Sequence, residues 1–259
     1  MSTYGLCPLS SVPLRAEPSD RSEMVNQVLF GEHFAVLDTQ KNWVRIRLSH
    51  DSYEGWMDTK QVFPLSEEQF NRLNSAPLIT LSNELVDMVI DDSERALFPI
   101  WIGSTLPHYE GGKFQLGEDL FGFQGDVVAS SQQKELLVEN AFMYLHAPYL
   151  WGGRTPFGID CSGFTQMVYR LNGIAIPRDA SQQAEIGQIH SFLEECEPGD
   201  LAFFDNDEGA IIHVGILLGN NKIIHASGRV RVDRIDQQGI FNVDTGRHTH
   251  KLRLLKRLV

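Results

Sequence analysis

The spacing of apolar residues changes near Ser130, and this change constrains the fold more than any other feature of the chain. Before it, short runs of β-branched and aromatic residues such as Trp43–Leu48 lie between turn residues, which is typical of strands in a small barrel. After it, apolar residues recur at helical spacing, from Leu136 to Leu145 and again from Phe164 to Leu171. Four strand-like runs follow, LAFF, HVGILLG, KIIHAS and LRLLKRLV. Helices followed by an antiparallel sheet predict an α+β domain over residues 129–259.

The N-terminal half is expected to hold two further parts. Residues 1–65 predict one small β-barrel. Residues 66–128 begin with a polar stretch of partly helical spacing, in which Ser66 and Gln69 predict a capping box. Strands then return around a hairpin turn at Tyr109–Lys113. We therefore expect a helical spacer and a second small barrel in this segment.

Charge and cysteine content narrow the classes of function. The net charge is 22 − 34 = −12, which argues against a nucleic acid as partner because phosphate binding needs a basic face. The sequence holds no apolar run of membrane-spanning length. Its first residues show no basic start followed by an apolar core, so we expect a cytoplasmic protein, or an exported one if a leader has been removed. The three cysteines, Cys7, Cys161 and Cys196, do not form a disulfide framework and fit a reducing compartment.

One cysteine stands where a helix is expected to begin. Asp160 is a preferred N-cap residue, which would place Cys161 in the first turn. Unpaired N–H groups there lower a thiol pKa and favour the nucleophilic thiolate. Ser162 and Gly163 are small, so a substrate carbonyl could approach. The backbone N–H of Cys161 is placed to help stabilise an oxyanion.

Two histidines provide a base and a residue to orient it. His213 opens the run HVGILLG and His225 lies in KIIHAS, and the turn between these runs predicts a hairpin. Cross-strand neighbours in a hairpin can touch, so His225 could hold the working tautomer of a general base, His213. Each residue alone also fits an ordinary structural role, Cys161 as a small buried apolar side chain above all. The ordered set favours nucleophilic catalysis.

This set resembles the NlpC-type cysteine peptidases of bacterial cell-wall metabolism. That resemblance implies a papain-like catalytic domain with Cys161, His213 and His225 as its triad, and one or two SH3-like barrels before it. The matching stretches follow in the family's order over residues 130 to the end: Pro148-Tyr-Leu-Trp-Gly-Gly, Asp160-Cys-Ser-Gly-Phe, Ile176-Pro-Arg-Asp-Ala-Ser-Gln-Gln, Pro198-Gly-Asp-Leu-Ala-Phe-Phe, His213-Val-Gly-Ile and Ile224-His-Ala-Ser-Gly.

The N-terminal half resembles that of the γ-D-glutamyl-L-diamino acid peptidases within this family, which trim free murein peptides with an unblocked L-Ala. The resemblance implies that a barrel residue closes one end of the cleft, and Tyr53 matches that position. Glu17 and Asp160 are the implied contacts of the substrate ammonium. A small murein peptide is thus the expected partner.

Four more residues are assigned to the substrate. The hydroxyl of Tyr149 could help hold the oxyanion, and Ser162 follows the nucleophile. Arg178 and Ser181 could face the carboxylate of the diamino acid, although Arg178 fits a structural salt bridge equally well.

No cofactor and no metal site are expected. His248 and His250 lack the spacing of metal ligands and are interpreted as an accidental surface pair. Three alternatives stay open: an exported endopeptidase acting on intact cell wall, an amidase or acyltransferase of the same fold, and a non-catalytic module that binds peptide or glycan. The preferred diamino acid and the oligomeric state are not predicted, and a monomer is compatible with the sequence.

Overall fold

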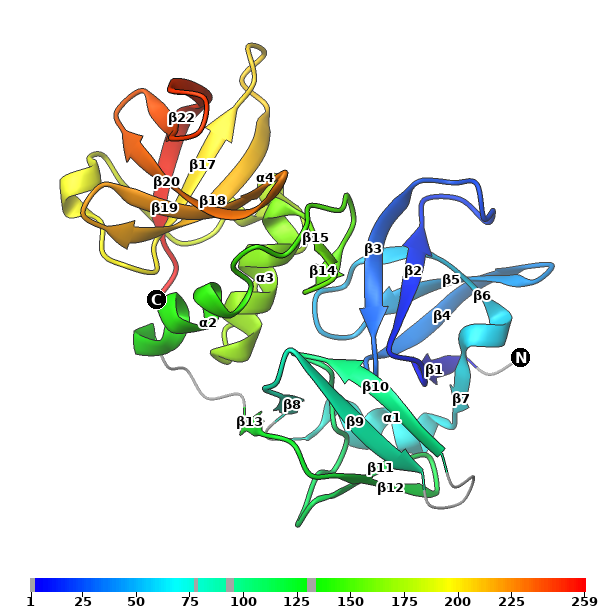
Figure 1. The fold of residues 1–259 in the computed structure, drawn as a ribbon. Helices are drawn as coiled ribbons and strands as arrows, with labels where there is room; N and C mark the ends of the chain where they lie inside the picture. The colour runs from blue at the N-terminus through cyan, green and yellow to red at the C-terminus, as the bar shows by residue number, and fades with distance from the viewer. Residues whose placement is uncertain (1–2, 77–78, 92–95, 130–133) are drawn as a thin grey trace. The chain divides into compact units, whose positions relative to one another are not determined.

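The chain folds into two compact units, Met1–Ser131 and Gln132–Val259 (Figure 1). The computed structural model describes residues 3–76, 79–91, 96–129 and 134–259. Among these residues no helix is long and apolar enough to span a membrane. The expected α+β class is confirmed, with small β-structures in the first unit and helices with a sheet in the second.

The first unit begins with an antiparallel sheet of seven strands in the order β3-β2-β6-β5-β4-β1-β7. Alternation of buried and exposed residues along β5 explains its place, because Val44, Ile46 and Leu48 point into the core between exposed arginines. The strands are β1 (Tyr4–Leu6), β2 (Ser11–Arg15), β3 (Met24–Leu29), β4 (His33–Gln40), β5 (Trp43–Leu48), β6 (Glu54–Asp58) and β7 (Phe63–Leu65), with a short 3-10 helix, η1 (Thr59–Gln61), before β7.

A helix and two smaller sheets complete the first unit. Helix α1 (Glu67–Asn74) begins with the predicted capping box, in which Ser66 and Gln69 each satisfy the other's backbone N–H. The helical part of the predicted spacer is limited to these eight residues, and the polar segment beyond it forms strands instead. Residues 77–78 and 92–93 of that segment lie outside the described residues. The strands are β8 (Thr80–Ser82), β9 (Val86–Asp91), β10 (Ala96–Trp101), β11 (Lys113–Leu116), β12 (Asp119–Phe123) and β13 (Val127–Ala129), paired as β10-β9-β12-β11 and β13-β8.

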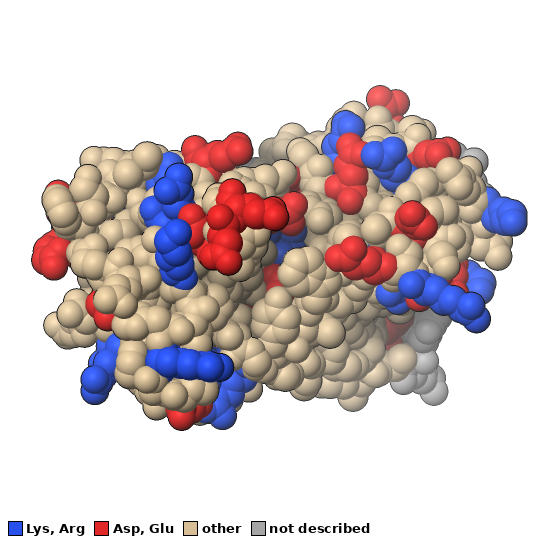
Figure 2. Space-filling view, turned by 90° about the horizontal axis from the view of Figure 1, so that it is seen from above, with Lys and Arg blue, Asp and Glu red and all other residues tan. Residues whose placement is uncertain are grey.

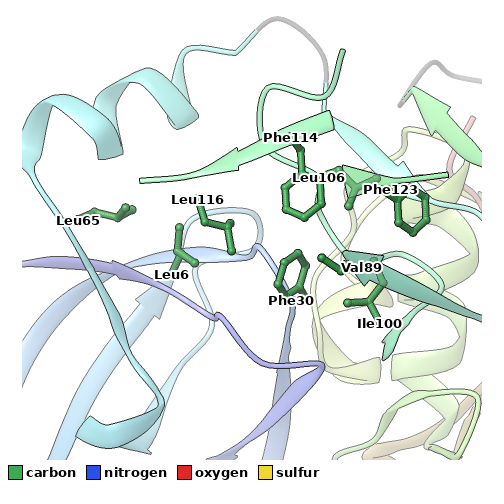
Figure 3. Packing of buried hydrophobic residues seen from close by; sticks show 9 residues of the cluster. All are labelled: Leu6, Phe30, Leu65, Val89, Ile100, Leu106, Phe114, Leu116 and Phe123. Carbon is green, nitrogen blue, oxygen red and sulfur yellow. The ribbon is translucent and has the colours of Figure 1, made fainter. Parts of the chain in front are cut away.

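One hydrophobic core joins the two β-structures of the first unit. Figure 3 shows Leu6 and Leu65 from the first sheet region near Leu116 of a later strand, and Phe30 near Phe114. The rings of Phe30 and Phe114 meet edge to face, with centroids 5.6 Å apart, an arrangement that adds to the apolar burial. The early and late strands of this unit therefore depend on each other for their burial.

The second unit places its helices before its sheet, as predicted. The helix that was expected to start near Ser130 and end at Pro148 corresponds to α2, which ends earlier, at Met143. Residues 130–133 lie outside the described residues. Helix α3 packs on strands β18 and β19. The elements before the main sheet are η2 (Lys134–Leu136), α2 (Leu137–Met143), β14 (Arg154–Thr155), β15 (Gly158–Ile159), α3 (Cys161–Leu171) and α4 (Ala180–Gln183).

The last strand closes the sheet of the second unit on itself. Strand β22 (Arg247–Arg257) pairs through its first half with β21 and through its second half with β17, so that six strands form a closed antiparallel ring. Two of these strands, β20 and β21, were not predicted. The remaining elements are β16 (Gln188–His190), η3 (Leu193–Glu195), β17 (Leu201–Asp205), β18 (Ile211–Gly219), β19 (Lys222–Ser227), β20 (Arg229–Asp236) and β21 (Gly239–Asn242), with β16 paired outside the ring to β22.

Acidic and basic side chains are interspersed on the face shown in Figure 2. Basic residues on that face stand beside acidic ones and do not merge into a broad basic surface.

Candidate active site

The start of helix α3 is fixed by Asp160, the predicted N-cap. Its Oδ1 accepts the N–H of Gly163 at 2.7 Å, and its Oδ2 accepts the N–H of Gly152 at 2.8 Å. One carboxylate thus joins the helix to the loop before it, and Cys161 is the first residue of the helix. The local sequence therefore positions the candidate nucleophile as expected.

Asp160 also forms a buried ion pair. Arg178 donates to both of its carboxylate oxygens, at 3.0 and 2.6 Å, and to the hydroxyl of Ser162 at 2.9 Å. The side chains of Arg178 and Asp160 are 2% and 7% exposed. The salt bridge considered for Arg178 is therefore present. Substrate contacts of Asp160, Arg178 and Ser162 remain predictions.

Gly163 has a packing role that differs from the one expected. A Cβ on this residue would lie 2.3 Å from the carbonyl oxygen of Gly153 and 3.0 Å from Oδ1 of Asp160. The space that a Gly163 side chain would occupy is thus filled by the preceding loop. The approach of a substrate carbonyl to the thiol remains a prediction. Glycine is needed here because the loop approaches the first turn of α3 so closely.

The two candidate histidines meet on neighbouring strands. The register that pairs Ile216 of β18 with Ile224 of β19 brings Gly215 opposite His225, and a Cβ on Gly215 would lie 2.9 Å from that of His225. His213 lies two residues before Gly215, on the same face of β18. Its Nε2 is 2.8 Å from Nδ1 of His225, so the predicted contact is present.

Strand β18 also reaches the thiol. The backbone of Val214, the residue after His213, interacts with the thiol of Cys161 and lowers its pKa, although burial outweighs this effect. The packing of α3 on β18 therefore places the candidate nucleophile beside the residue that would activate it.

Burial leaves the thiol and the imidazole uncharged. Loss of water, and then the charge of Asp160, raise the pKa of Cys161 to about 12 and outweigh the effect of Val214. The expected lowering of this pKa at the helix N-terminus is therefore overridden. Burial, followed by His225 and His250, holds the pKa of His213 well below its usual value. His213, if it acts as the predicted base, would then take the thiol proton as the sulfur attacks.

Tyr149 and Ser181 occupy different settings near the helix start. Tyr149 is half-buried, and its backbone pairs with Ile159 just before the N-cap. Burial, and then the charges of Cys161 and Asp160, raise its pKa to about 12, so its hydroxyl remains a donor. Ser181 is exposed on α4. Their contacts with an oxyanion and a substrate carboxylate remain predictions.

Tyr53 and Glu17 belong to the first unit. Tyr53 is half-buried, packs against the core of the first sheet, and donates its backbone N–H to Asp51 at 3.0 Å. Glu17 is exposed, and its backbone N–H donates to Ser22 at 2.9 Å. Their predicted role at the cleft of the second unit remains a prediction.

Two residues of the site, Asp233 and His250, were not assigned to it from the sequence. Asp233 of β20 accepts a hydrogen bond from Nε2 of His225 at 3.1 Å. His250 of β22 stacks on His213 and is separated from His248, which binds Asp236 of β20 at 2.9 Å. The interpretation of His248 and His250 as a surface pair is therefore wrong. The alternation of polar and apolar residues in RVRVDRID was the available signal for β20. Its many arginines and aspartates kept this segment from being predicted as a strand.

Comparisons with known proteins agree with this architecture. Residues 146–247 match the NlpC/P60 family, and residues 14–62 match the bacterial dipeptidyl-peptidase Sh3 domain. A gamma-D-glutamyl-L-lysine dipeptidyl-peptidase of Bacillus subtilis is 35% identical over 217 residues, covering 77% of this chain and 71% of the relative. Dipeptidyl-peptidase 6 of Lysinibacillus sphaericus is 27% identical, covering 87% and 89%. The crystal structure of an NlpC/P60 family protein from Bacillus cereus has the same fold, with a TM-score of 0.83, 20% identity and 99% of both chains covered.

A papain-like α+β domain that follows an SH3-like β-structure, with a cysteine opening a helix beside paired histidines, defines a cysteine peptidase. The family matches and the similarity to the Bacillus subtilis protein identify the family to which this cysteine peptidase belongs. The chain belongs to the NlpC/P60 family.

Proposed function

We propose that this protein hydrolyses the bond between the γ-carbonyl of D-Glu and a diamino acid in murein peptides with a free N-terminal L-Ala. The observation that carries the chemistry is the 2.8 Å contact between His213 Nε2 and His225 Nδ1, together with the interaction of the Cys161 thiol with the backbone of Val214, the residue after His213. The substrate class is supported by the relatives named gamma-D-glutamyl-L-lysine dipeptidyl-peptidase. A cytoplasmic role in recycling released wall peptides belongs to the same proposal.

The first half of the reaction forms a thioester. Cys161 Sγ attacks the γ-carbonyl carbon while His213 takes the thiol proton. The backbone N–H of Cys161 and the Tyr149 hydroxyl stabilise the oxyanion. The C–N bond then breaks, and His213 gives its proton to the leaving amine of the diamino acid.

The second half releases the L-Ala-D-Glu product. His213 takes a proton from water as the oxygen attacks the thioester carbon, and it returns that proton to the sulfur when the C–S bond breaks, which restores the thiol. His225 keeps His213 oriented through both halves. The chain's own side chains account for every proton transfer in this scheme.

The test is turnover of L-Ala-γ-D-Glu-L-Lys and of its diaminopimelate analogue, each beside an N-acetylated twin, followed by mass spectrometry. We expect cleavage of the free-amine peptides and a loss of roughly 10⁴-fold or more in Cys161→Ala. Equal cleavage of both twins would refute the ammonium roles of Glu17 and Asp160 and the cleft role of Tyr53. A Cys161→Ala protein with full turnover would refute the thiol mechanism.

A second candidate is an endopeptidase of intact cell wall. Probable endopeptidase p60 of Listeria welshimeri is 41% identical over 105 residues, although these cover only 20% of that protein. Purified murein sacculi are therefore included as a substrate in the same assay. Release of soluble muropeptides from sacculi at rates matching the free peptide would favour this candidate, and cell fractionation would then show the protein outside the cytoplasm.

A further inference from the structure

A line of buried hydrogen bonds continues beyond the two candidate histidines. His213 contacts His225, and Nε2 of His225 contacts Oδ2 of Asp233 at 3.1 Å. Both His225 and the Asp233 side chain are almost completely buried. The register that pairs His225 with Arg231 puts Asp233 at the diagonal position on the same face of the sheet. The pairing of β19 with β20 therefore places Asp233 in contact with His225.

Asp233 remains ionised despite its burial. Burial alone would raise its pKa, but the hydrogen bonds from His225 and Arg231 outweigh burial and hold that pKa well below its usual range. Arg231 donates to both carboxylate oxygens, at 2.7 and 3.0 Å, and the N–H of Val243 donates to Oδ1 at 3.0 Å. An ionised carboxylate can only accept hydrogen bonds.

The charge of Asp233 determines where the protons lie on both rings. Nε2 of His225 must donate to it, and since burial lowers the pKa of His225, its Nδ1 carries no proton and accepts. Nε2 of His213 must then donate to His225. The uncharged His213 is left with an unprotonated Nδ1, which is the nitrogen of this ring that can accept a proton.

We infer that Asp233 is a positioning residue that fixes the tautomers of His225 and His213, so that His213 is ready to act as a base. The inference rests on the proposed function for its catalytic consequence, but the tautomers themselves can be measured without any substrate. Other charged or titratable groups near these rings are His250 on β22 and Arg231 on β20. The thiol of Cys161 on α3 interacts with the backbone of Val214, the residue after His213.

Asp233→Asn is the informative substitution because an amide has only one acceptor oxygen. At the Oδ1 position that oxygen would satisfy two fixed donors, Arg231 and Val243. The NH₂ group would then face both His225 and Nε of Arg231. Of these two donors only the His225 ring can relieve the contact by changing tautomer. His225 would carry its proton on Nδ1 and donate to His213, which would leave His213 protonated on Nδ1 and unable to act as a base.

The experiment is ¹⁵N NMR of the histidine rings in the full chain, with turnover measured in parallel. The wild type is expected to show both rings protonated on Nε2, and Asp233→Asn to show both protonated on Nδ1. The kcat should fall by about 10²-fold or more with KM changed less than about threefold, as expected when a base is held in the wrong tautomer. Asp236→Asn is the matched control, because it changes an exposed His–Asp pair on the same strand, and should leave tautomers and turnover unchanged.

Each outcome decides a separate point. A wild-type His225 protonated on Nδ1 would overturn the inference, and this spectrum needs no variant to fold. Unchanged tautomers and kcat in a folded Asp233→Asn would overturn it as well. If the wild type cleaves none of the murein peptides while its tautomers are as expected, the proposed function fails and the positioning by Asp233 stands.

Discussion

The imidazole of His250 stacks on that of His213, with ring centroids 4.2 Å apart and 26° between their planes. The two residues lie on β22 and β18, which are not adjacent strands. Phe204 of β17, the strand between them, contacts both rings. The candidate base is therefore held from the side by an aromatic stack as well as through its hydrogen bond to His225.

The first prediction concerns the acid limb of activity. His250 is one of the groups that lower the pKa of His213, because its positive charge at low pH opposes protonation of the neighbouring ring. His250→Phe keeps an aromatic ring in the stack and removes that charge. We expect the pKa of His213 to rise and the acid limb of kcat/KM to move to higher pH. A pH–rate profile measures this, with His248→Phe on the same strand as control, and an unmoved limb in His250→Phe would contradict the electrostatic role.

The second prediction concerns thiol reactivity. The pKa values of Cys161, Cys196 and Cys7 are all raised, to about 12, 11 and 12, by burial first. Iodoacetamide should therefore alkylate Cys161 more slowly at pH 7 than a free cysteine of pKa about 8.5. Peptide mapping by mass spectrometry distinguishes the three thiols, and Cys161→Ala identifies the background. Rapid alkylation of Cys161 with a midpoint below pH 8 would instead indicate a resting thiolate.

The third prediction concerns the ion pair beneath the nucleophile. Arg178→Met leaves the buried carboxylate of Asp160 without its cation, and such a change costs about 3–5 kcal/mol of stability. The exposed Arg72 pairs with the exposed Glu68 at 3.3 Å, and Arg72→Met should cost less than about 1 kcal/mol. Denaturant unfolding compares the two variants. A stable Arg178→Met with a raised KM would assign Arg178 to the substrate carboxylate instead.

The fourth prediction concerns stability in acid. Burial lowers the pKa values of His213, His225 and His250 below 6.5, that of His250 to about 4. The unfolded chain therefore binds more protons than the folded chain below pH 6.5. Stability should fall as pH decreases, by up to about 1.4 kcal/mol per pH unit for each histidine that remains uncharged in the folded protein.

Denaturant unfolding at pH 7.5, 6 and 5 measures this dependence. His250→Phe serves as the internal comparison, because removing one such histidine should make the dependence less steep. Carboxylates with lowered pKa, such as Asp233, add to the loss only below about pH 4, outside this range. An unchanged free energy of unfolding between pH 7.5 and 5 would show that the three rings are protonated without cost.

Local features of the site and fold could be predicted from sequence because they depend on neighbouring residues. The N-cap Asp160 and the capping box of Ser66 and Gln69 form hydrogen bonds within three positions along the chain. The contact of His213 with His225 needs only one hairpin, whose strands the apolar runs reveal. Each of these contacts spans only one helix turn or one pair of adjacent strands.

The sequence by itself determined that the helices of the second unit precede its sheet, that α3 begins at Cys161 and that the two histidines meet. Only the tertiary structure decided which other groups reach them. Asp233 contacts His225 through the pairing of β20, whose charged residues hid the strand, and His250 reaches His213 because β22 closes the ring. The tertiary structure also decided the charge state of the thiol, because burial and Asp160 together outweigh the groups that lower its pKa. Burial and long-range strand pairing depend on parts of the chain that meet only after folding, so no local pattern encodes them.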